Sequence, residues 1–396
     1  MVDAALEVTP QPPPVREADI VIIGAGLCGS AAAVVLGRAG YRVVLIDRQA
    51  ASPPLFRVEA VDSGQAELFN RLGLLDCVAA AATRYDLIVN ARHGRVVDHT
   101  REVHYGLRYQ DLVRTVREQL PDTVEFVVGG VTDISTGPEQ QRVTLAAQGT
   151  VVGRLLVLAT GLGDVLGEKL GMSSTVLFEK HSIPFGFDVA PLPGRRFPFQ
   201  SLTYYGETPA DRIDYLTVFP IGAAMRANLF TFRDDRDPWT RNFRRAPKDI
   251  LLATLPGLAA FLGDFEVLSP VQSWVMSLCE VAGHDQQGVA VIGDAFQTSC
   301  PAAGTGVTRV LTDVECLCRL VPAWLASPGM GREKIAQLYA DPAKRAADRN
   351  SFAMARSRRT LTVDTGVVAE TRRRQHFLRR RIAEWFRGGA EASATT

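Results

Sequence analysis

The sequence predicts an α/β protein in which a parallel sheet with intervening helices is interrupted by a second, mostly antiparallel sheet. Three apolar, strand-like runs end at glycines, near residues 19–24, 154–161 and 288–293. Near-continuous apolar runs of this length are typical of central parallel strands. Between about residues 175 and 279, short strand-like pieces are separated by turns rich in proline and glycine, which is typical of antiparallel sheet.

The first apolar run leads into a glycine-rich turn and a helix. The turn reads Gly24-Ala-Gly26-Leu-Cys-Gly29, residues 31–38 favour helix, and residues 42–46 favour a strand that ends at Asp47. Gly24 permits a tight turn, Gly26 leaves room for a pyrophosphate, and Gly29 allows the helix to pack against the sheet. The helix N-terminus favours an anion, and Asp47 is placed to bind ribose hydroxyls. This order predicts an adenine-dinucleotide site.

A second strand, loop and helix follow much later in the chain. Residues 288–293 form the strand, Asp294 follows Gly293, and a loop with Pro301, Gly304 and Gly306 leads into a helix that starts near Val307. Asp294 is placed to accept from a sugar hydroxyl, and the loop is placed to present N–H groups to a flavin ring or phosphate. A tight connection with an aspartate helix cap explains the same spacing equally well.

Composition and charge limit the class of protein. The chain has 396 residues, 46% apolar and 22% charged, and a formal net charge of +1, which argues against a nucleic-acid partner. The six cysteines include no Cys-x-x-Cys pair and indicate reduced thiols, so we expect a cytoplasmic protein without a metal site. No run reaches the roughly 18–20 apolar residues of a membrane span.

These patterns predict an order of domains along the chain. We expect a disordered lead-in over 1–17, the first part of the dinucleotide domain over 18–175, a substrate domain over 176–283 and the second dinucleotide part over 284–328. A C-terminal helical region is expected over 329–388 and a disordered tail over 389–396.

The C-terminal region holds two runs of three arginines, at residues 372–374 and 379–381. One interpretation is contact with nucleic acid or an anionic membrane. The interpretation that we favour is a solvated helix with an apolar side made of Phe377, Leu378, Ile382, Trp385 and Phe386.

Taken together, these motifs resemble the FAD-dependent monooxygenases of the p-hydroxybenzoate hydroxylase type. The resemblance covers roughly residues 19–320 and implies a Rossmann-like, GR2-type FAD-binding domain with an inserted antiparallel substrate domain. It implies that FAD is bound by Gly24, Gly26, Gly29, Asp47, Arg48, Arg57, Gln110, Thr160, Gly161, Gly293, Asp294, Pro301, Gly304 and Gly306. It also implies that a flavin hydroperoxide passes one oxygen atom of O₂ to a small, aromatic or unsaturated substrate.

The sequence departs from the family pattern at two motifs. Phe296 and Gln297 stand where the family usually has Ala-His, and Ala159-Thr160-Gly161 replaces Ala-Asp-Gly. In the family, the second of these motifs also contacts the nicotinamide donor. NAD(P)H is therefore expected either to reduce the flavin directly or to act through a separate flavin reductase, as in two-component epoxidases and halogenase-like enzymes.

No catalytic base stands out. Tyr204, Tyr205 and His181 are candidates by residue type, as is His284. Aromatic side chains that qualify to line a substrate pocket are Phe185, Phe187, Phe199, Tyr204, Tyr205, Phe219 and Phe230. Two other functions remain open, a flavin dehydrogenase or double-bond reductase of the geranylgeranyl-reductase type and a flavin-binding protein without turnover.

Overall fold

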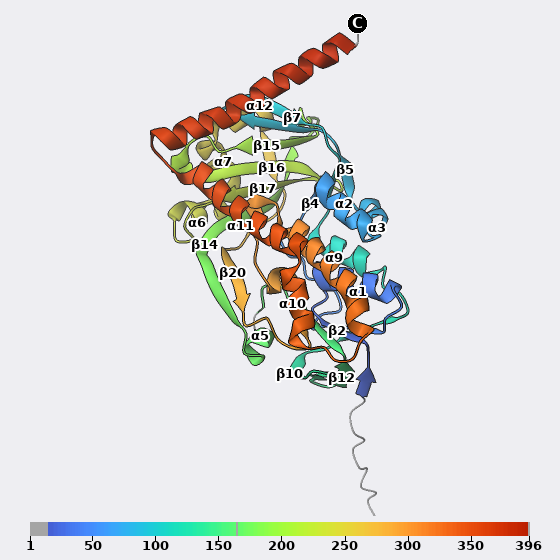
Figure 1. The fold of residues 1–396 in the computed structure, drawn as a ribbon. Coiled ribbons are helices and arrows are strands. Elements are labelled where there is room, and N and C mark those ends of the chain that lie inside the picture. Colours follow the sequence, from blue (N-terminus) through green and yellow to red (C-terminus); the bar gives the residue numbers. More distant parts are fainter. Residues whose placement is uncertain (1–14, 164, 395–396) are drawn as a thin grey trace, which may run out of the picture.

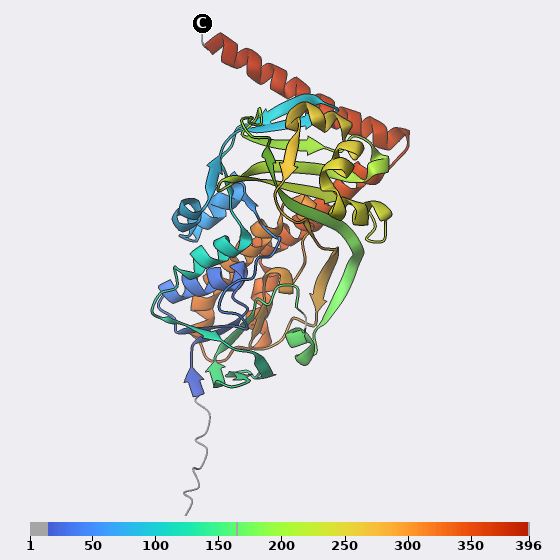
Figure 2. The ribbon, with the colours of Figure 1, turned by 180° about the vertical axis from the view of Figure 1, so that it is seen from behind.

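The structure, a computed structural model, describes residues 15–163 and 165–394, with side chains described as far as Phe386 (Figure 1). A parallel sheet and its helices form the lower half of the molecule in this view, and a larger sheet forms the upper half. The view from behind shows that the long strand β14 (Ser173–Pro191) joins the two halves (Figure 2).

The parallel sheet has five strands in the order β21-β13-β2-β3-β9. The apolar strands predicted before the two glycine turns are confirmed as β2 and β21. Both faces of a central parallel strand are buried, so apolar residues are favoured along its whole length. The strands are β2 (Ile20–Ile23), β3 (Val43–Asp47), β9 (Val124–Val128), β13 (Leu155–Leu158) and β21 (Val289–Val291).

Two hydrophobic layers cover this sheet. Ile20, Ile22 and Leu45 pack with the apolar faces of α1 (Leu27–Arg38), α4 (Tyr109–Arg117) and α9 (Gly306–Leu325). Alternate residues such as Val21 and Val44 face a four-stranded sheet, β1-β12-β11-β10. Its strands are β1 (Val15–Glu17), β10 (Val131–Ser135), β11 (Gln141–Leu145) and β12 (Gly149–Gly153).

The large sheet follows the order β18-β14-β17-β16-β15-β6-β7, with β19 and β20 paired to β14. All pairs in it are antiparallel except β15 with β6. Its strands besides β14 are β6 (Ile88–Arg92), β7 (Arg95–Thr100), β15 (Ser201–Tyr205), β16 (Ile213–Ile221), β17 (Ala224–Thr231), β18 (Phe265–Val267), β19 (Gln272–Ser273) and β20 (Met276–Ala282).

Short helices cover one face of the large sheet and leave the other face to a cavity. Phe243, Leu251 and Leu258 pack on Phe185 and Tyr204. Pro256 and Gly257 separate α7 from α8, because proline and glycine interrupt regular helix. The covering helices are α6 (Pro238–Arg245), α7 (Pro247–Thr254), the 3₁₀ turn Pro256–Leu258 and α8 (Ala259–Leu262).

A small sheet and short helices connect the two halves. The sheet has the order β4-β8-β5. These elements are β4 (Ala60–Val61), β5 (Thr83–Tyr85), β8 (His104–Gly106), α2 (Ser63–Arg71), α3 (Leu75–Ala81) and α5 (Val165–Lys169). Asp62 caps α2 by accepting from Gln65 N at 2.8 Å, while Gln65 reaches back to Asp62 N, which forms a capping box.

Three helices complete the chain, α10 (Arg332–Ala340), α11 (Pro342–Val363) and α12 (Val367–Ala394). Helix α12 crosses the end of the large sheet beside β7 and projects beyond it (Figure 1). The predicted disordered tail over 389–396 is wrong as far as Ala394, because its alanines favour helix. Residues 395 and 396 lie outside the described part.

The predicted lead-in over 1–17 is corrected at its end. Val15–Glu17 forms β1, which pairs in parallel with β12, and Arg16 binds Glu125 at 2.8 Å. Residues 1–14 lie outside the described part. The remaining domain boundaries stay predictions, and β6 and β7, from the first predicted dinucleotide part, pair into the large sheet. Of the helices in the described ranges, none has the length and apolar character needed to cross a membrane.

Candidate functional site

The first glycine turn is built by backbone packing. Gly24 has φ of 101°, and its N–H donates to Ile46 O at 2.8 Å. A Cβ on Gly29 would lie 1.9 Å from Gly24 O, so the helix approaches the turn too closely for any side chain. A Cβ on Gly26 would instead project toward the hydroxyl of Tyr109, at 3.1 Å. Gly24 and Gly29 therefore shape the turn, and Gly26 keeps its surface open.

The acid that ends β3 is tied to this turn. Asp47 Oδ2 accepts from Ala25 N at 2.7 Å, and Oδ1 accepts from Gln49 N at 3.0 Å. Arg117 of α4 donates from Nε to Ala25 O at 2.8 Å. These bonds fix β3, the turn and α4 relative to one another. Arg117 was not predicted, because nothing in its local sequence distinguishes it from a surface arginine.

The second glycine turn is held by buried charges. Gly293 has φ of 68°, its N–H donates to Asp313 Oδ2 at 2.8 Å, and its carbonyl accepts from Arg309 Nη2 at 3.0 Å. Lys344 of α11 donates to Asp313 at 2.8 Å. Burial lowers the pKa of Arg309, but neighbouring carboxylates, first Asp313, raise it above its usual value, so the guanidinium stays charged.

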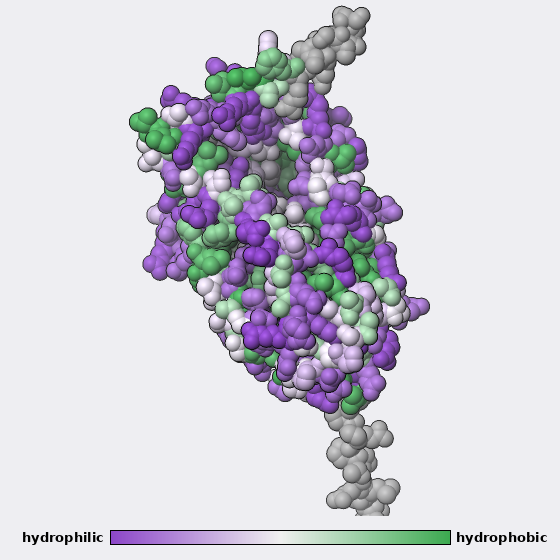
Figure 3. Space-filling view, viewed as in Figure 1, coloured by the Kyte–Doolittle hydropathy of each residue, from purple (hydrophilic) through white to green (hydrophobic). Residues whose placement is uncertain are grey.

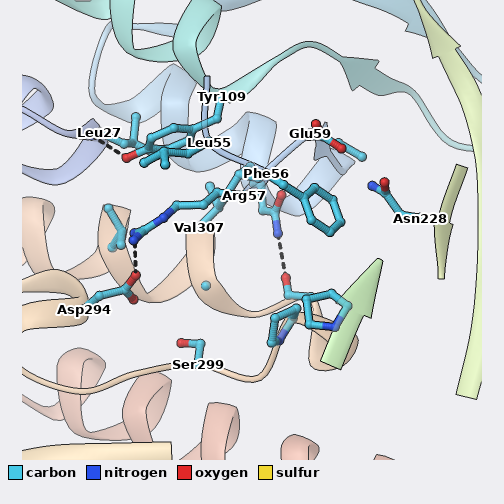
Figure 4. A pocket seen from close by; sticks show the side chains of 18 of the residues that line it. Leu27, Leu55, Phe56, Arg57, Glu59, Tyr109, Asn228, Asp294, Ser299 and Val307 are labelled. Atoms are coloured by element: carbon cyan, nitrogen blue, oxygen red, sulfur yellow. Dashed lines mark hydrogen bonds and ion pairs between the residues drawn. The ribbon is translucent and has the colours of Figure 1, made fainter. Parts of the chain in front are cut away.

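The two turns meet around one space. Arg57, from the loop before β4, lies 3.5 Å from Asp294 (Nη1 to Oδ2). Gln65 Nε2 donates to Gly304 O at 2.9 Å. Figure 4 shows Arg57 pointing at Asp294, while Tyr109 reaches toward Leu27 at the start of α1. Segments more than two hundred residues apart in the chain are thus joined at this point.

A cavity of about 760 Å³ runs between the two turns and continues to the large sheet. Its walls include most of the predicted cofactor residues, namely Gly24, Gly26, Asp47, Arg48, Arg57, Thr160, Gly161, Asp294, Pro301, Gly304 and Gly306. Asp164, three residues after Gly161, lies outside the described residues.

Three predicted cofactor residues do not line the cavity. Gly29 and Gly293 lie behind its wall, where they shape the turns. Gln110 does not line the cavity, but its neighbour Tyr109 does, because successive residues of a helix point in different directions. Burial raises the pKa of Tyr109, although Arg57 opposes this shift.

The other end of the cavity is lined by the free face of the large sheet. Tyr215, Thr217 and Phe219 alternate along β16, while Leu216 and Val218 face the covering helices. Tyr205 and Phe230 join this wall from β15 and β17. Residues that the sequence reasoning missed here include Tyr215, Thr217, Asn228, Trp274 and Arg358. Tyr215 and Thr217 could have been found from the sequence, because they are four and two residues before Phe219 and alternate residues of a strand face the same side.

Strand alternation also corrects the list of aromatic candidates. Phe185, Phe187 and Tyr204 are buried under the helices on the opposite face, and Phe199 packs against that core. The Tyr204 hydroxyl donates to Glu207 and accepts from Gly94 N at 3.0 Å. Tyr204 is therefore wrong as a cavity residue, whereas Tyr205, Phe219 and Phe230 line the cavity.

The histidine candidates lie away from the cavity. His181 is fully buried between Phe178 and Phe232, and its ring nitrogens have no hydrogen-bond partner among the described residues. Burial, together with the charge of Arg359, lowers its pKa to about 4. His284 packs on Phe296 and Tyr339. Neither ring belongs to the cavity wall.

A buried ion network joins the two halves beside the cavity. Arg226 of β17 binds Glu59 at 2.7 Å, Asp188 at 3.2 Å and Gln272 at 2.8 Å. Arg108, just before α4, binds Asp188 at 2.7 Å. Burial raises the pKa of Glu59, and Arg226 opposes that shift. Since Glu59 also lines the cavity, this network fixes the position of its wall.

The site's geometry matches a known family. A family profile described as an FAD binding domain matches residues 17–351, more than half of the chain. The chain belongs to this family. Open glycine turns, an acid at the end of β3 and a cavity between the turns are the features that such a domain uses to hold a dinucleotide.

Curated relatives are identical to the chain at about a quarter of the aligned residues. Squalene epoxidase 4 of Arabidopsis thaliana is 24% identical over 336 residues, which cover 76% of this chain and 61% of the relative. Aklavinone 12-hydroxylase DnrF of Streptomyces peucetius is 26% identical over 343 residues, which cover 75% of this chain and 66% of the hydroxylase. The chain spans less than two thirds of the length of the squalene epoxidase that it matches.

Solved structures of other proteins share the fold of the chain. The p-nitrophenol 4-monooxygenase PnpA from Pseudomonas putida DLL-E4 has a TM-score of 0.73 and 18% identity, covering 92% of this chain and 93% of that one. The flavin-dependent brominase Bmp2 has a TM-score of 0.66 and 17% identity, and the match covers 82% of this chain and 83% of the brominase. The fold of the chain is therefore that of the p-hydroxybenzoate hydroxylase type, an α/β FAD-binding domain carrying a second sheet.

Proposed function

We propose that this chain is an FAD-dependent monooxygenase that inserts one oxygen atom of O₂ into a small aromatic or unsaturated substrate. The observation that carries the proposal is one continuous cavity with a dinucleotide cradle at one end and an aromatic wall at the other. A cavity of about 760 Å³ lies within the size range of sites for organic ligands. Membership of the FAD-binding family and its oxygenase relatives supports the same reaction class.

The residues present fit FAD. Gly26 and Gly304 both line the cavity and have no side chain, and a Cβ on Gly304 would meet nothing within 4 Å, so a ligand can approach the backbone of both turns. Asp47 and Arg48 would hold the adenosine end, and Asp294, Pro301, Gly304 and Gly306 the flavin end, with Arg57, Thr160 and Gly161 between them. When bound, FAD supplies the redox chemistry that activates O₂.

The large sheet would bind and orient the substrate. Tyr205, Tyr215, Phe219 and Phe230 offer ring faces to an apolar or aromatic molecule and exclude water from it. Asn228 and Thr217 add neutral hydrogen-bonding groups to the same wall. Burial raises the pKa of Cys300, which also lines the cavity, so it is a neutral thiol at pH 7 and an unsuitable base.

NAD(P)H is the proposed source of electrons, either directly or through a flavin reductase. The test is to reconstitute the full chain with FAD and add NADH or NADPH without oxygen. Bleaching of the flavin supports a self-sufficient enzyme, whereas bleaching only with an added reductase supports a two-component system. The cytoplasmic location remains a prediction.

Oxygen insertion is tested with ¹⁸O₂. The protein is supplied with reduced flavin and a panel of phenols and alkenes, and products are analysed by mass spectrometry. Incorporation of one labelled atom supports the proposal. Substrate reduction or dehydrogenation without label would favour the reductase alternative, and tight FAD without turnover would favour a binding protein. Asp294→Asn, which removes a charged hydrogen-bond acceptor from the flavin end, is expected to weaken FAD binding about 10-fold or more.

A further inference from the structure

Helix α12 carries its apolar side chains on the face that points away from the protein. Its inward face is mainly polar. Arg380 binds Asp98 at 2.7 Å, and Arg373 donates to Asp364 O at 2.9 Å. Phe377 adds an apolar contact, with its ring centroid 5.2 Å from that of Tyr205. An ordinary surface helix buries its apolar stripe, so α12 has the opposite arrangement.

The outward stripe is wide and exposed. Leu378, Ile382 and Trp385 are spaced by four and three positions, so they lie on one side of the helix, opposite Arg373 and Arg380. Their exposed fractions are 56%, 46% and 74%, and Phe386 beside them is 64% exposed. The sequence predicted that five residues form one apolar side of this helix. This prediction is corrected, since Phe377 faces the body whereas the other four side chains are exposed.

Arginines flank the stripe on both sides. By helical spacing, Arg374 and Arg381 fall on one edge and Arg372 and Arg379 on the other. All four are exposed, and in the described part of the chain only Arg374 has an acidic partner, Glu370, at 2.8 Å. Figure 3 shows apolar surface next to strongly hydrophilic surface along the top of the molecule, where α12 lies.

We propose that α12 docks this protein onto an anionic lipid bilayer. The apolar stripe enters the boundary between headgroups and acyl chains, and the flanking arginines bind lipid phosphates. An exposed apolar face with tryptophan and phenylalanine, bordered by arginines, has the composition of helices that lie in this interface.

Charge complementarity favours a lipid surface over a second copy of the chain. A symmetric dimer through this face would bring the arginine rows of both copies together. The acidic residue Glu384 faces inward, 2.7 Å from His99, and so is not placed to neutralise them. The helix would lie on the membrane rather than span it, in agreement with its alternation of charged and apolar residues.

The test uses the full chain with FAD and vesicles of phosphatidylcholine alone or mixed with phosphatidylglycerol. We expect co-sedimentation with the anionic vesicles, at least about 10-fold weaker at about 0.5 M than at about 0.1 M salt. A blue shift of tryptophan emission should accompany binding and disappear in Trp385→Phe. Sedimentation should persist in that variant, since phenylalanine keeps the apolar contact.

Variants separate the two parts of the interaction. The triple change Leu378→Ser, Ile382→Ser and Trp385→Ser should weaken binding at least about 10-fold. Arg379→Gln with Arg381→Gln should weaken binding only to anionic vesicles, by about 10-fold. Leu268→Ser, at another apolar side chain that is 54% exposed, is the matched control and should bind normally. Unchanged FAD affinity and melting temperature show that each variant is folded.

Two results would overturn the proposal. One is the absence of any binding of the wild-type chain to anionic vesicles. The other is a concentration-dependent dimer that the triple serine change converts to a monomer, which would show that a second copy covers this face. Either result is independent of the oxygenase assay, so it leaves the proposed reaction unaffected.

Discussion

Tyr205 and Arg380 join the cavity wall to the C-terminal helix. Arg380 Nη1 donates to the Tyr205 hydroxyl at 2.5 Å, and the same guanidinium binds Asp98 through bonds of 2.7 and 2.8 Å. An arginine can only donate, so the tyrosine oxygen accepts from it and the hydroxyl proton is not used in this bond. The helix thus sets both the position and the hydrogen-bonding direction of Tyr205.

Tyr205→Phe should therefore reduce turnover without affecting the cofactor. We expect kcat/KM for an accepted substrate to fall about 10-fold, the loss of one hydrogen bond in a buried site. FAD affinity should stay unchanged. The matched control is Tyr204→Phe, which leaves Glu207 and Gly94 N without their shared partner and should lower the free energy of unfolding by about 1–3 kcal/mol. Turnover that is equally reduced in both variants would refute a role for Tyr205.

Arg380→Gln should destabilise the protein, because Asp98 is buried and would lose its charged partner. Arg380 is partly exposed, so we expect a loss of about 1–3 kcal/mol rather than the full effect of a buried pair. Chemical denaturation measures this change. Arg379→Gln, at the exposed neighbouring position, should change stability by less than about 0.5 kcal/mol. Adding Asp98→Asn to Arg380→Gln should recover part of the loss.

Two glycines of the first turn should respond differently to alanine. Gly29→Ala places a Cβ 1.9 Å from a backbone oxygen and should destabilise the fold by about 1–3 kcal/mol or more. Gly26→Ala places a Cβ 3.1 Å from the Tyr109 hydroxyl, on the cavity side. Its melting temperature should change little, while FAD affinity falls at least about 10-fold. Flavin fluorescence titration and thermal melts separate the outcomes, and normal FAD binding by Gly26→Ala would contradict the cradle.

His181 should make stability depend on pH. Its pKa in the folded protein is lowered to about 4, below the ordinary value of 6.5, so the unfolded chain binds more protons between these values. Its contribution is present above about pH 6.5 and is lost as the pH falls toward 4. His181→Phe should remove this part of the pH dependence while keeping the ring contacts with Phe178 and Phe232. If the wild-type chain and His181→Phe gave the same dependence of melting temperature on pH, His181 would not be the group that titrates.

The sequence by itself determined the fold class and the dinucleotide end of the site. Apolar strands, glycines at fixed spacing and an acid at a strand end are local features, and the backbone geometry that they require is local as well. Gly24, Gly26 and Asp47 were predicted as cofactor residues in this way, whereas Asp294 and Gly304 were chosen by the family resemblance. All five line the cavity, and the helical character of the C-terminal region was also predicted.

Only the tertiary structure decided which side chains face the cavity. Tyr204 and Tyr205 are adjacent on one strand, and alternation says that they point to opposite faces without saying which face is covered by helices. Arg358 and Arg380 come from helices whose packing depends on distant strands. The orientation of α12 also depends on tertiary contacts. Its inward face is the one that makes the ion pair with Asp98 and the ring contact with Tyr205, and its apolar stripe is left outside.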